Sequence, residues 1–349
     1  MEFAFTEEQA MIAETVRGFF AERASSERTR EAMAAGGIDR PLWDAFCGEL
    51  ALAGVAVPEA LGGAGLGMVE FALVAEAAGA QVAALPLPPL AMALAALAAG
   101  GGAPADRWLA AIMAGEAVPA FSADFVREGG GDRLTGTARF VAYATSADVL
   151  FFSEAGGGTW AVPAGAPGLR ITPHVTMDQT RPLADVRLDD VAAEPLGAGA
   201  REAALRSGWL CLAAEALGGA QAALDRTAAY AKERVQFGRP VGSFQAYKHR
   251  LADMMVEIEQ ARSAVYWAAC AIDEKSDETD LALHAAKAFC TDTYRMCAGN
   301  MIQLHGGIGF TWEHDAHLFF KRARGAGSML GDSDWHREQV ARLVIGAAA

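Results

Sequence analysis

Two short segments in the last third of the chain carry groups that suit a phosphorylated ligand. Arg234 supplies a guanidinium, which matches the geometry of phosphate oxygens, and Phe237 follows three residues later. Gln303 offers a side-chain amide, and the adjacent Gly306 and Gly307 let a ligand approach the backbone closely. Each segment also has a plainer explanation, in which the arginine is a surface cation at a helix end and the glycines end a helix.

Two carboxylates, Asp332 and Glu215, stand at the edges of helical or apolar runs. Asp332 stands in GDSDW at the start of a helical pattern, where its carboxylate could take a proton or cap the helix. Glu215 lies near the end of an apolar run, where a structural or interface role fits better. Three histidines lack the i, i+4 spacing of a helical metal pair and have no Cys or acid cluster beside them, so we expect no metal site: His305, His314 and His317.

Helical periodicity dominates the first third of the chain. Thr6 with Gln9 forms a capping-box pattern, and the apolar residues after it recur on one stripe that needs a helical partner. Further helices are predicted near residues 40–53, 68–80, 89–100 and 105–115. These patterns predict an all-α domain over residues 1–116.

The middle of the chain has the pattern of a small β domain. Between residues 117 and 197, short β-branched and aromatic runs alternate with glycine-rich turns. The predicted strands are 133–140, 147–152, 159–163, 169–174 and 182–190.

From residue 198 to 349 the helical period returns. Long amphipathic segments at 200–233, 243–273 and 279–304, with a last helix starting near Asp332 or Ser333, predict a four-helix bundle. The predicted fold class is therefore α+β and mostly α, with a helical domain, a small β domain and a bundle in that order.

Composition limits the partners and the compartment. The net charge of −14 disfavours nucleic acid and anionic membranes unless basic residues gather locally, and no basic patch is visible in the sequence. The apolar stretch 85–105 is interrupted by prolines and glycines, so no membrane span is expected. The acidic start is unlike a secretory signal, and the five cysteines stand singly, so a reducing cytoplasm is the expected location.

Three stretches together resemble the acyl-CoA dehydrogenase family. AAYAKERVQFGRPVGSFQAYKHRLADM (228–254) resembles the family's ERxxFG turn and FQ…LADM helix, and QLHGGIGFTWEHDAHLFFKRA (303–323) resembles its QxxGGxGxT segment. PEALGGAGLGMVEFALVAEAAG (58–79) is similar to its N-terminal domain. The resemblance implies α,β-desaturation of an acyl-CoA thioester, in which a carboxylate takes the α proton and FAD accepts the β hydrogen as hydride.

The resemblance also assigns the phosphate-suited residues. In the family each FAD lies across a subunit interface, and the neighbouring subunit reaches its ADP portion. By resemblance Arg234 pairs with the pyrophosphate and Phe237 packs on the cofactor, while Gln303, Gly306 and Gly307 supply an amide and close backbone.

The residues that would serve the chain's own active site differ from the family pattern. The ring-facing TEPxAGSD loop reads AFSADFVREGGGD (120–132), and Ala142 stands where the family has a hydroxyl. The usual base position holds Leu330, and the alternative base position on the first bundle helix holds Gly208. Trp209 lies near a position where the family contacts CoA with a polar residue.

These differences predict a non-catalytic partner subunit. The chain resembles the short subunit of heteromeric α2β2 actinobacterial acyl-CoA dehydrogenases that degrade sterol side chains, and would complete the FAD site of a longer catalytic subunit. The other partners implied are the acyl-CoA substrate and an electron-transfer flavoprotein. Two alternatives remain open: an active homo-oligomeric dehydrogenase with Asp332 as base, and a flavin-free scaffold.

Overall fold

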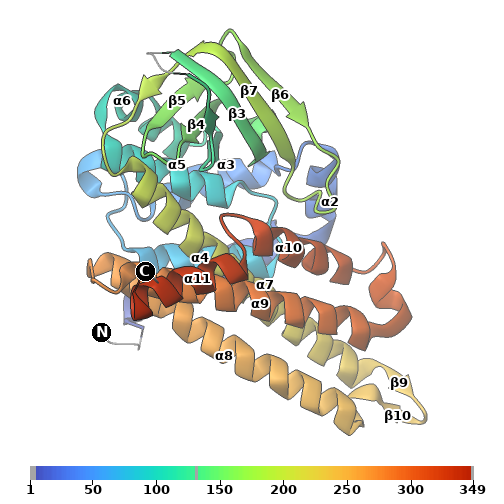
Figure 1. Cartoon of the computed structure of the whole chain (residues 1–349). Coiled ribbons are helices and arrows are strands. Elements are labelled where there is room, and N and C mark those ends of the chain that lie inside the picture. The colour runs from blue at the N-terminus through green and yellow to red at the C-terminus, as the bar shows by residue number, and fades with distance from the viewer. Residues whose placement is uncertain (1–4, 130–132, 347–349) are drawn as a thin grey trace. The chain divides into compact units, whose positions relative to one another are not determined.

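A computed structural model describes residues 5–129 and 133–346 (Figure 1). The chain divides into two compact units. One consists of Met1–Ser26, Met68–Ala83 and Leu212–Ala349, and the other of Glu27–Gly67 and Ala84–Cys211. The long helix α7 (Ala200–Glu233) begins in the second unit and continues into the first.

The second unit contains two four-stranded sheets. One has the order β1 (Pro119–Ser122), β4 (Val149–Ser153), β5 (Thr159–Pro163) and β8 (Glu194–Pro195), with β1 parallel to β4 and the other pairs antiparallel. The antiparallel sheet has the order β2 (Val126–Arg127), β3 (Arg133–Ala142), β7 (Leu183–Ala192) and β6 (Leu169–Pro173). Their inner faces share a core that includes Leu134, Leu150, Phe152, Val162, Val186 and Leu188.

All five strands predicted from the sequence are present, within about two residues of their predicted bounds. Three further strands of the second unit were not predicted, β1, β2 and β8, each of two to four residues. Strands this short contain too few alternating apolar and polar residues to be distinguished from the loops around them.

Helices α2 (Ser26–Ala34), α3 (Arg40–Gly48), α5 (Leu87–Gly100) and α6 (Gly102–Met113) accompany the sheets, with 3₁₀ turns at Leu52–Gly54 and Glu59–Leu61. Asp39 caps α3 by accepting the Leu42 N–H at 3.1 Å, and its other oxygen accepts from Arg28 Nε at 2.8 Å. The predicted helix at 40–53 is therefore real but ends five residues early. Helix α2 was missed, because its polar sequence shows no apolar period.

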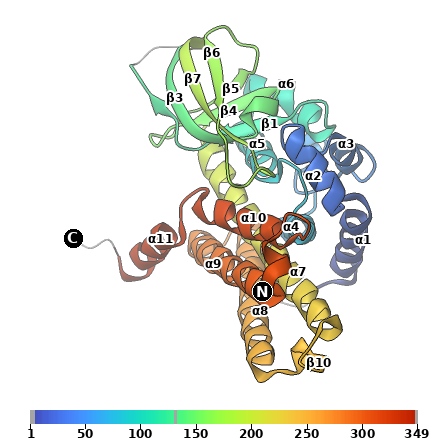
Figure 2. The same cartoon turned by 90° about the vertical axis from the view of Figure 1, so that its right-hand side faces the viewer.

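The first unit is helical throughout its described residues, apart from a small hairpin. It contains α1 (Glu7–Arg23), α4 (Met68–Ala80), α8 (Gln245–Asp273), α9 (Thr279–His305), α10 (Ala316–Ser328) and α11 (Ser333–Ile345). Helices α8 and α9 run side by side, α10 and α11 pack on α9, and α1 packs on α4 (Figures 1 and 2). The predicted capping box is confirmed, since Thr6 and Gln9 exchange side-chain to backbone hydrogen bonds of 3.1 Å.

Close contact between α4 and the bundle depends on glycine. A Cβ on Gly218 of α7 would lie 1.8 Å from the carbonyl oxygen of Glu76 in α4. A Cβ on Gly79 of α4 would lie 2.1 Å from the carbonyl oxygen of Glu215 in α7. The two backbones therefore touch directly, which no larger residue at either position would allow.

The predicted fold class, α+β and mostly α, is confirmed. The division at residues 116 and 197 stays a prediction. None of the helices among the described residues has the length and the apolar character that crossing a bilayer requires.

Candidate functional site

The first predicted binding segment is a strained, exposed hairpin at the end of α7. Strands β9 (Val235–Gln236) and β10 (Arg239–Pro240) pair through a two-residue turn in which Phe237 has φ +54° and Gly238 has φ +76°. This turn type matches the twist of a hairpin but costs a bulky residue conformational energy. The Phe237 side chain is nevertheless 92% exposed. A strained backbone at a residue whose aromatic side chain is exposed to solvent is typical of a functional site, because neither feature stabilises the fold.

Arg234 lies at the base of this hairpin. Its side chain is exposed, and its guanidinium makes no hydrogen bond or ion pair within the part of the chain that the structure describes. Its backbone is held, because its N–H donates to the Tyr230 carbonyl at 2.9 Å and its carbonyl accepts from the Val241 N–H at 2.8 Å. The result is a fixed backbone with a guanidinium available to a ligand.

The second predicted segment follows directly from the end of α9. Gln303 is exposed on the last turn, and Gly306, with φ +64°, ends the helix before the 3₁₀ turn η5 (Gly306–Phe310). A Cβ at Gly306 or at Gly307 would meet nothing within 4 Å, so internal packing does not require the absence of a side chain there. Open space around both glycines fits a backbone that another molecule approaches.

The structure brings the two segments to the same end of the bundle (Figure 1). The Tyr230 hydroxyl of α7 donates to the carbonyl of His305 at 3.2 Å, and the Tyr247 hydroxyl of α8 donates to the carbonyl of Leu304. Five exposed hydrophobic side chains belong to these segments and the loop that follows: Val235, Phe237, Ile308, Phe310 and Trp312. Exposed apolar side chains gathered in this way mark an interaction site.

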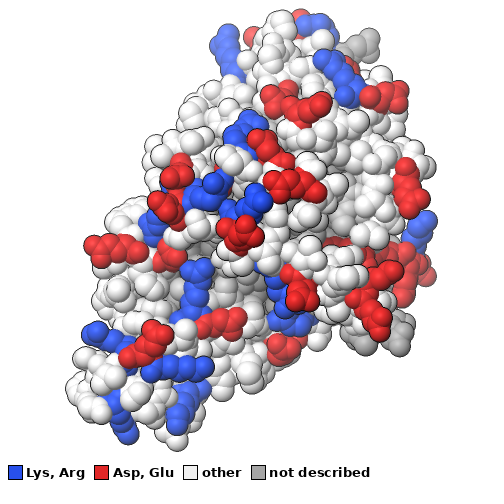
Figure 3. Space-filling view, turned by 180° about the vertical axis from the view of Figure 1, so that it is seen from behind, with Lys and Arg blue, Asp and Glu red and all other residues white. Residues whose placement is uncertain are grey.

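Basic side chains are concentrated at this end. Figure 3 shows them at its lower left, and the exposed residues between 232 and 250 include Lys232, Arg234, Arg239, Lys248 and Arg250. The sequence-based expectation that the chain has no basic patch is therefore wrong. The net charge of −14 conceals a local cationic surface suited to an anionic ligand.

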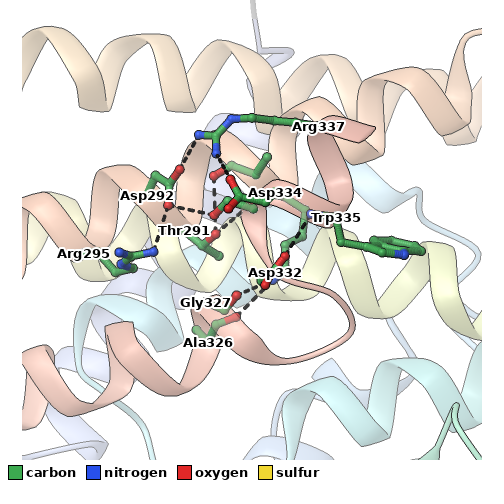
Figure 4. Close-up of polar contacts among 12 residues, drawn as sticks. Thr291, Asp292, Arg295, Ala326, Gly327, Asp332, Asp334, Trp335 and Arg337 are labelled. Atoms are coloured by element: carbon green, nitrogen blue, oxygen red, sulfur yellow. Dashed lines mark hydrogen bonds and ion pairs between the residues drawn. The ribbon is translucent and has the colours of Figure 1, made fainter. Parts of the chain in front are cut away.

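Asp332, the candidate base, caps a helix. Its Oδ1 accepts the Trp335 N–H at 2.8 Å at the start of α11 (Figure 4). It lines a hollow of about 520 Å³ whose other charged residues are Arg295, Arg324, Arg337, Asp292 and Asp334. Helix capping, the plainer of the two explanations, accounts for the position of this carboxylate.

A buried polar clamp fixes the turn at Leu330, the residue that the family resemblance aligns with the usual base. Leu330 and Gly331 form a turn with φ +53° and +96° between α10 and α11. The fully buried Lys287 donates from Nζ to the carbonyls of Gly331 at 2.7 Å and Ala326 at 3.1 Å. His336 Nε2 lies 3.1 Å from the Leu330 carbonyl oxygen. The sequence reasoning missed both Lys287 and His336, which fix this turn from beneath.

Hydrogen-bond directions assign the histidine tautomers in this clamp. Because a carbonyl can only accept, His336 Nε2 carries the proton toward Leu330. His336 Nδ1 must then accept from His284 Nδ1, which lies 2.8 Å away. Burial, with a smaller contribution from the positive charge of Lys287, lowers the pKa of His336 to about 3. Burial also lowers the pKa of His284, so both rings are neutral at pH 7.

This depressed pKa predicts a loss of stability in mild acid. Because unfolded His336 titrates near 6.5 and the folded side chain near 3, its contribution is complete above pH 6.5 and is lost as the pH falls toward 3. The loss should reach about 2 kcal/mol at pH 5. Urea unfolding at pH 7.5 and 5 measures it. The His336→Gln variant should show a flatter pH dependence, whereas His249→Gln, at an exposed position of α8, should not. An unchanged slope in His336→Gln would contradict this assignment.

Glu215 forms a buried ion pair. Its Oε1 lies 3.4 Å from Arg322 Nη1, and both side chains are 5% exposed.

Gly208, which the resemblance aligns with the alternative base position, lies within α7 next to the buried Trp209. That position therefore holds no carboxylate.

The segments that the resemblance aligns with the family's ring-facing positions form parts of the sheets and their core. Ala142 is buried at the end of β3, and the hydroxyl of the next residue, Tyr143, lies 3.0 Å from the Leu85 carbonyl and 3.1 Å from the Thr180 carbonyl. In the 120–132 segment, residues 120–122 belong to β1 and 126–127 form β2, while 130–132 lie outside the described residues.

Comparison with known proteins agrees with this architecture. Residues 6–116 match the model of the acyl-CoA dehydrogenase N-terminal domain, and residues 197–345 match that of the C-terminal domain. Acyl-CoA dehydrogenase IpdE2 of Mycobacterium tuberculosis is 38% identical over 341 residues, which are 97% of this chain and 96% of IpdE2.

Solved structures extend the likeness to the whole chain. A variant of the Tcur3481-Tcur3483 steroid ACAD is 33% identical with a TM-score of 0.90, covering 98% of this chain and 99% of that one. The ChsE4-ChsE5 complex of Mycobacterium tuberculosis is 28% identical with a TM-score of 0.91, covering 100% of both chains. A structure of PigA with FAD and proline shares the fold at 22% identity and a TM-score of 0.90, covering 100% of both chains. The chain therefore belongs to the acyl-CoA dehydrogenase family, whose members are oxidoreductases acting on CH–CH bonds.

Proposed function

We propose that this chain is the non-catalytic subunit of a heteromeric acyl-CoA dehydrogenase and completes the FAD site of a longer catalytic subunit. One observation carries the proposal. The exposed bundle end keeps every predicted flavin-contacting residue available, whereas the usual base position holds Leu330 in a turn clamped by Lys287 and His336.

The bundle end fits the ADP portion of FAD. Arg234 offers an exposed guanidinium within a cationic surface, which suits a pyrophosphate. Phe237 presents an exposed ring, and Gly306 and Gly307 leave open space beside the backbone. When bound, FAD supplies the acceptor for the hydride that leaves the β carbon of the substrate. The residues of this chain would bind and orient the cofactor, and the partner would supply the base.

The relatives support a paired assembly and a bulky substrate. One similar structure is a complex of ChsE4 with ChsE5, and another is described as a steroid ACAD. We infer that the substrate is an acyl-CoA with a steroid-like acyl group, and that electrons pass on to an electron-transfer flavoprotein.

Flavin stoichiometry tests this proposal. The chain is expressed alone and together with a longer homologue that carries the glutamate base, and FAD is measured per polypeptide by absorbance. The proposal predicts little FAD in the chain alone, and about half an FAD per polypeptide with activity in the mixture. Full flavin and activity in the chain alone would instead establish an active homo-oligomer. A mixed assembly without flavin would establish a scaffold.

Asp332 can be tested separately as a base. Asparagine also caps helices, so Asp332→Asn should keep both stability and the activity of the mixed assembly. Asp332→Ala should lose about 1 kcal/mol of unfolding free energy while the folded protein keeps its activity. Urea unfolding and steady-state kinetics measure these effects. Loss of activity in a stably folded Asp332→Asn variant would favour the homo-oligomeric dehydrogenase.

A further inference from the structure

The two flavin-facing segments are about 70 residues apart in the sequence, and two tyrosines connect them. The last carbonyls of any α-helix lack partners within the helix. At the end of α9, the Gln303 carbonyl accepts from the Gly306 N–H. The next two carbonyls, of Leu304 and His305, accept from Tyr247 and Tyr230. The end of the helix is therefore capped by phenol groups from α7 and α8.

Stacking reinforces this connection. The Tyr230 ring lies on the His305 ring with centroids 4.4 Å apart and planes 28° apart. His305 is itself oriented, because its Nδ1 donates to the Met301 carbonyl at 2.7 Å. Its pKa is lowered, mainly by burial, so at neutral pH the ring is uncharged. One face of Tyr230 and its hydroxyl thus both contact the residue that directly precedes Gly306.

The same tyrosine also holds the hairpin. The Tyr230 carbonyl accepts the Arg234 N–H at 2.9 Å. Tyr230 therefore bonds to the backbone of both segments, at Arg234 and at His305. Tyr247 lies in the first turn of α8, and its N–H donates to the Phe244 carbonyl at 3.1 Å. Phe244 in turn contacts Phe237 edge to face, with centroids 6.2 Å apart. Tyr230 therefore links the end of α9 to the residue before β9, and Tyr247 links it, through Phe244, to Phe237 in the turn of the hairpin.

We propose that Tyr230 and Tyr247 are positioning residues of the flavin site, which set the Arg234 hairpin at a constant distance from Gly306 and Gly307 so that one dinucleotide contacts both. This inference rests on the proposed function. Neither tyrosine needs to touch the cofactor, because each acts through the backbone of the residues that do.

The proposed role requires both hydroxyls to stay protonated. Burial, with a smaller effect from neighbouring Tyr230, raises the pKa of Tyr247 above its usual value. The phenol remains a donor throughout the neutral range. The Tyr247 contact therefore does not depend on pH between 6 and 9.

Tyrosine to phenylalanine variants test the inference in the mixed assembly. Tyr230→Phe and Tyr247→Phe keep the rings and remove only the hydroxyls. Each should weaken FAD binding on the order of tenfold, the effect of one lost hydrogen bond, and the double variant should weaken it further. With saturating FAD, kcat should return to its original value, because the chemistry takes place elsewhere. Tyr266→Phe is the matched control: its hydroxyl donates to Glu76 Oε2 at 2.6 Å, away from these segments, and FAD affinity should not change.

Hydrogen exchange in the chain without flavin gives a second readout. The backbone N–H groups of residues 306–310 should exchange faster in both single variants and fastest in the double variant, but not in Tyr266→Phe. Unchanged exchange in the double variant would overturn the positioning role. Faster exchange with unchanged FAD affinity would overturn the link to the cofactor. Failure of the proposed function gives a different result, since FAD affinity would then be unaffected even by changes at Arg234.

Discussion

Arg234→Glu is expected to remove flavin from the mixed assembly. Arg234 is exposed and has a held backbone, so the substitution should leave the fold and the assembly with the partner intact. It replaces a charge-assisted contact to phosphate with a repulsive carboxylate. Losing such contacts costs about 3 kcal/mol, so FAD affinity should fall by roughly a hundredfold or more. Absorbance of the purified assembly and titration with FAD measure the change.

Arg239→Glu is the matched control on the opposite strand of the same hairpin. Its guanidinium lies 4.0 Å from the centre of the Phe244 ring, and the substitution changes the net charge by the same amount. A general electrostatic effect would weaken FAD binding equally in both variants. A specific contact predicts a much larger effect at Arg234. Full flavin retention in Arg234→Glu would contradict the assignment of this residue.

Arg322→Met is expected to lower the free energy of unfolding more than any other substitution proposed for this protein. Arg322 and Glu215 form an ion pair at 3.4 Å with both side chains 5% exposed, and Arg322 also lies 3.4 Å from the Ala83 carbonyl. Removing one partner of a buried pair leaves an uncompensated charge, which costs about 3–5 kcal/mol. Urea unfolding at pH 7 measures the loss.

Two further variants separate this charge effect from lost packing. The double variant Glu215→Leu/Arg322→Met removes both charges and should recover much of the stability. Arg342→Met disrupts an exposed pair with Glu338 and should change the unfolding free energy by less than about 1 kcal/mol. An Arg322→Met protein as stable as the original would show that the pair contributes nothing. In that case Glu215 would return as a candidate for a functional carboxylate.

Local sequence patterns predicted the long elements well. Helix α7 has the predicted bounds, 200–233. Apolar residues that recur with a period of 3.6 over about nine turns fit an α-helix and no other regular structure. The capping pair Thr6 and Gln9 is equally local. Strands of two residues, such as β2 and β8, exist only because a partner strand lies beside them, so their own sequence cannot reveal them.

The candidate site was predictable in part. Its residue types, from Arg234 to Gly307, were visible because they fall into two recognisable segments. The contacts that hold those segments together were not, since Tyr230 meets His305 only after α7 and α9 have packed. Lys287 shows the same limit. A lysine in a helical pattern is ordinarily a surface residue, and only the fold reveals that this one is fully buried among carbonyls.

The location of the flavin in the mixed assembly tests the central claim most directly. A structure of the two subunits together should show the isoalloxazine ring in the cleft of the longer subunit, with Arg234 of this chain at the pyrophosphate. An isoalloxazine ring bound to this chain instead, with one of its own carboxylates directed at a thioester, would contradict the account.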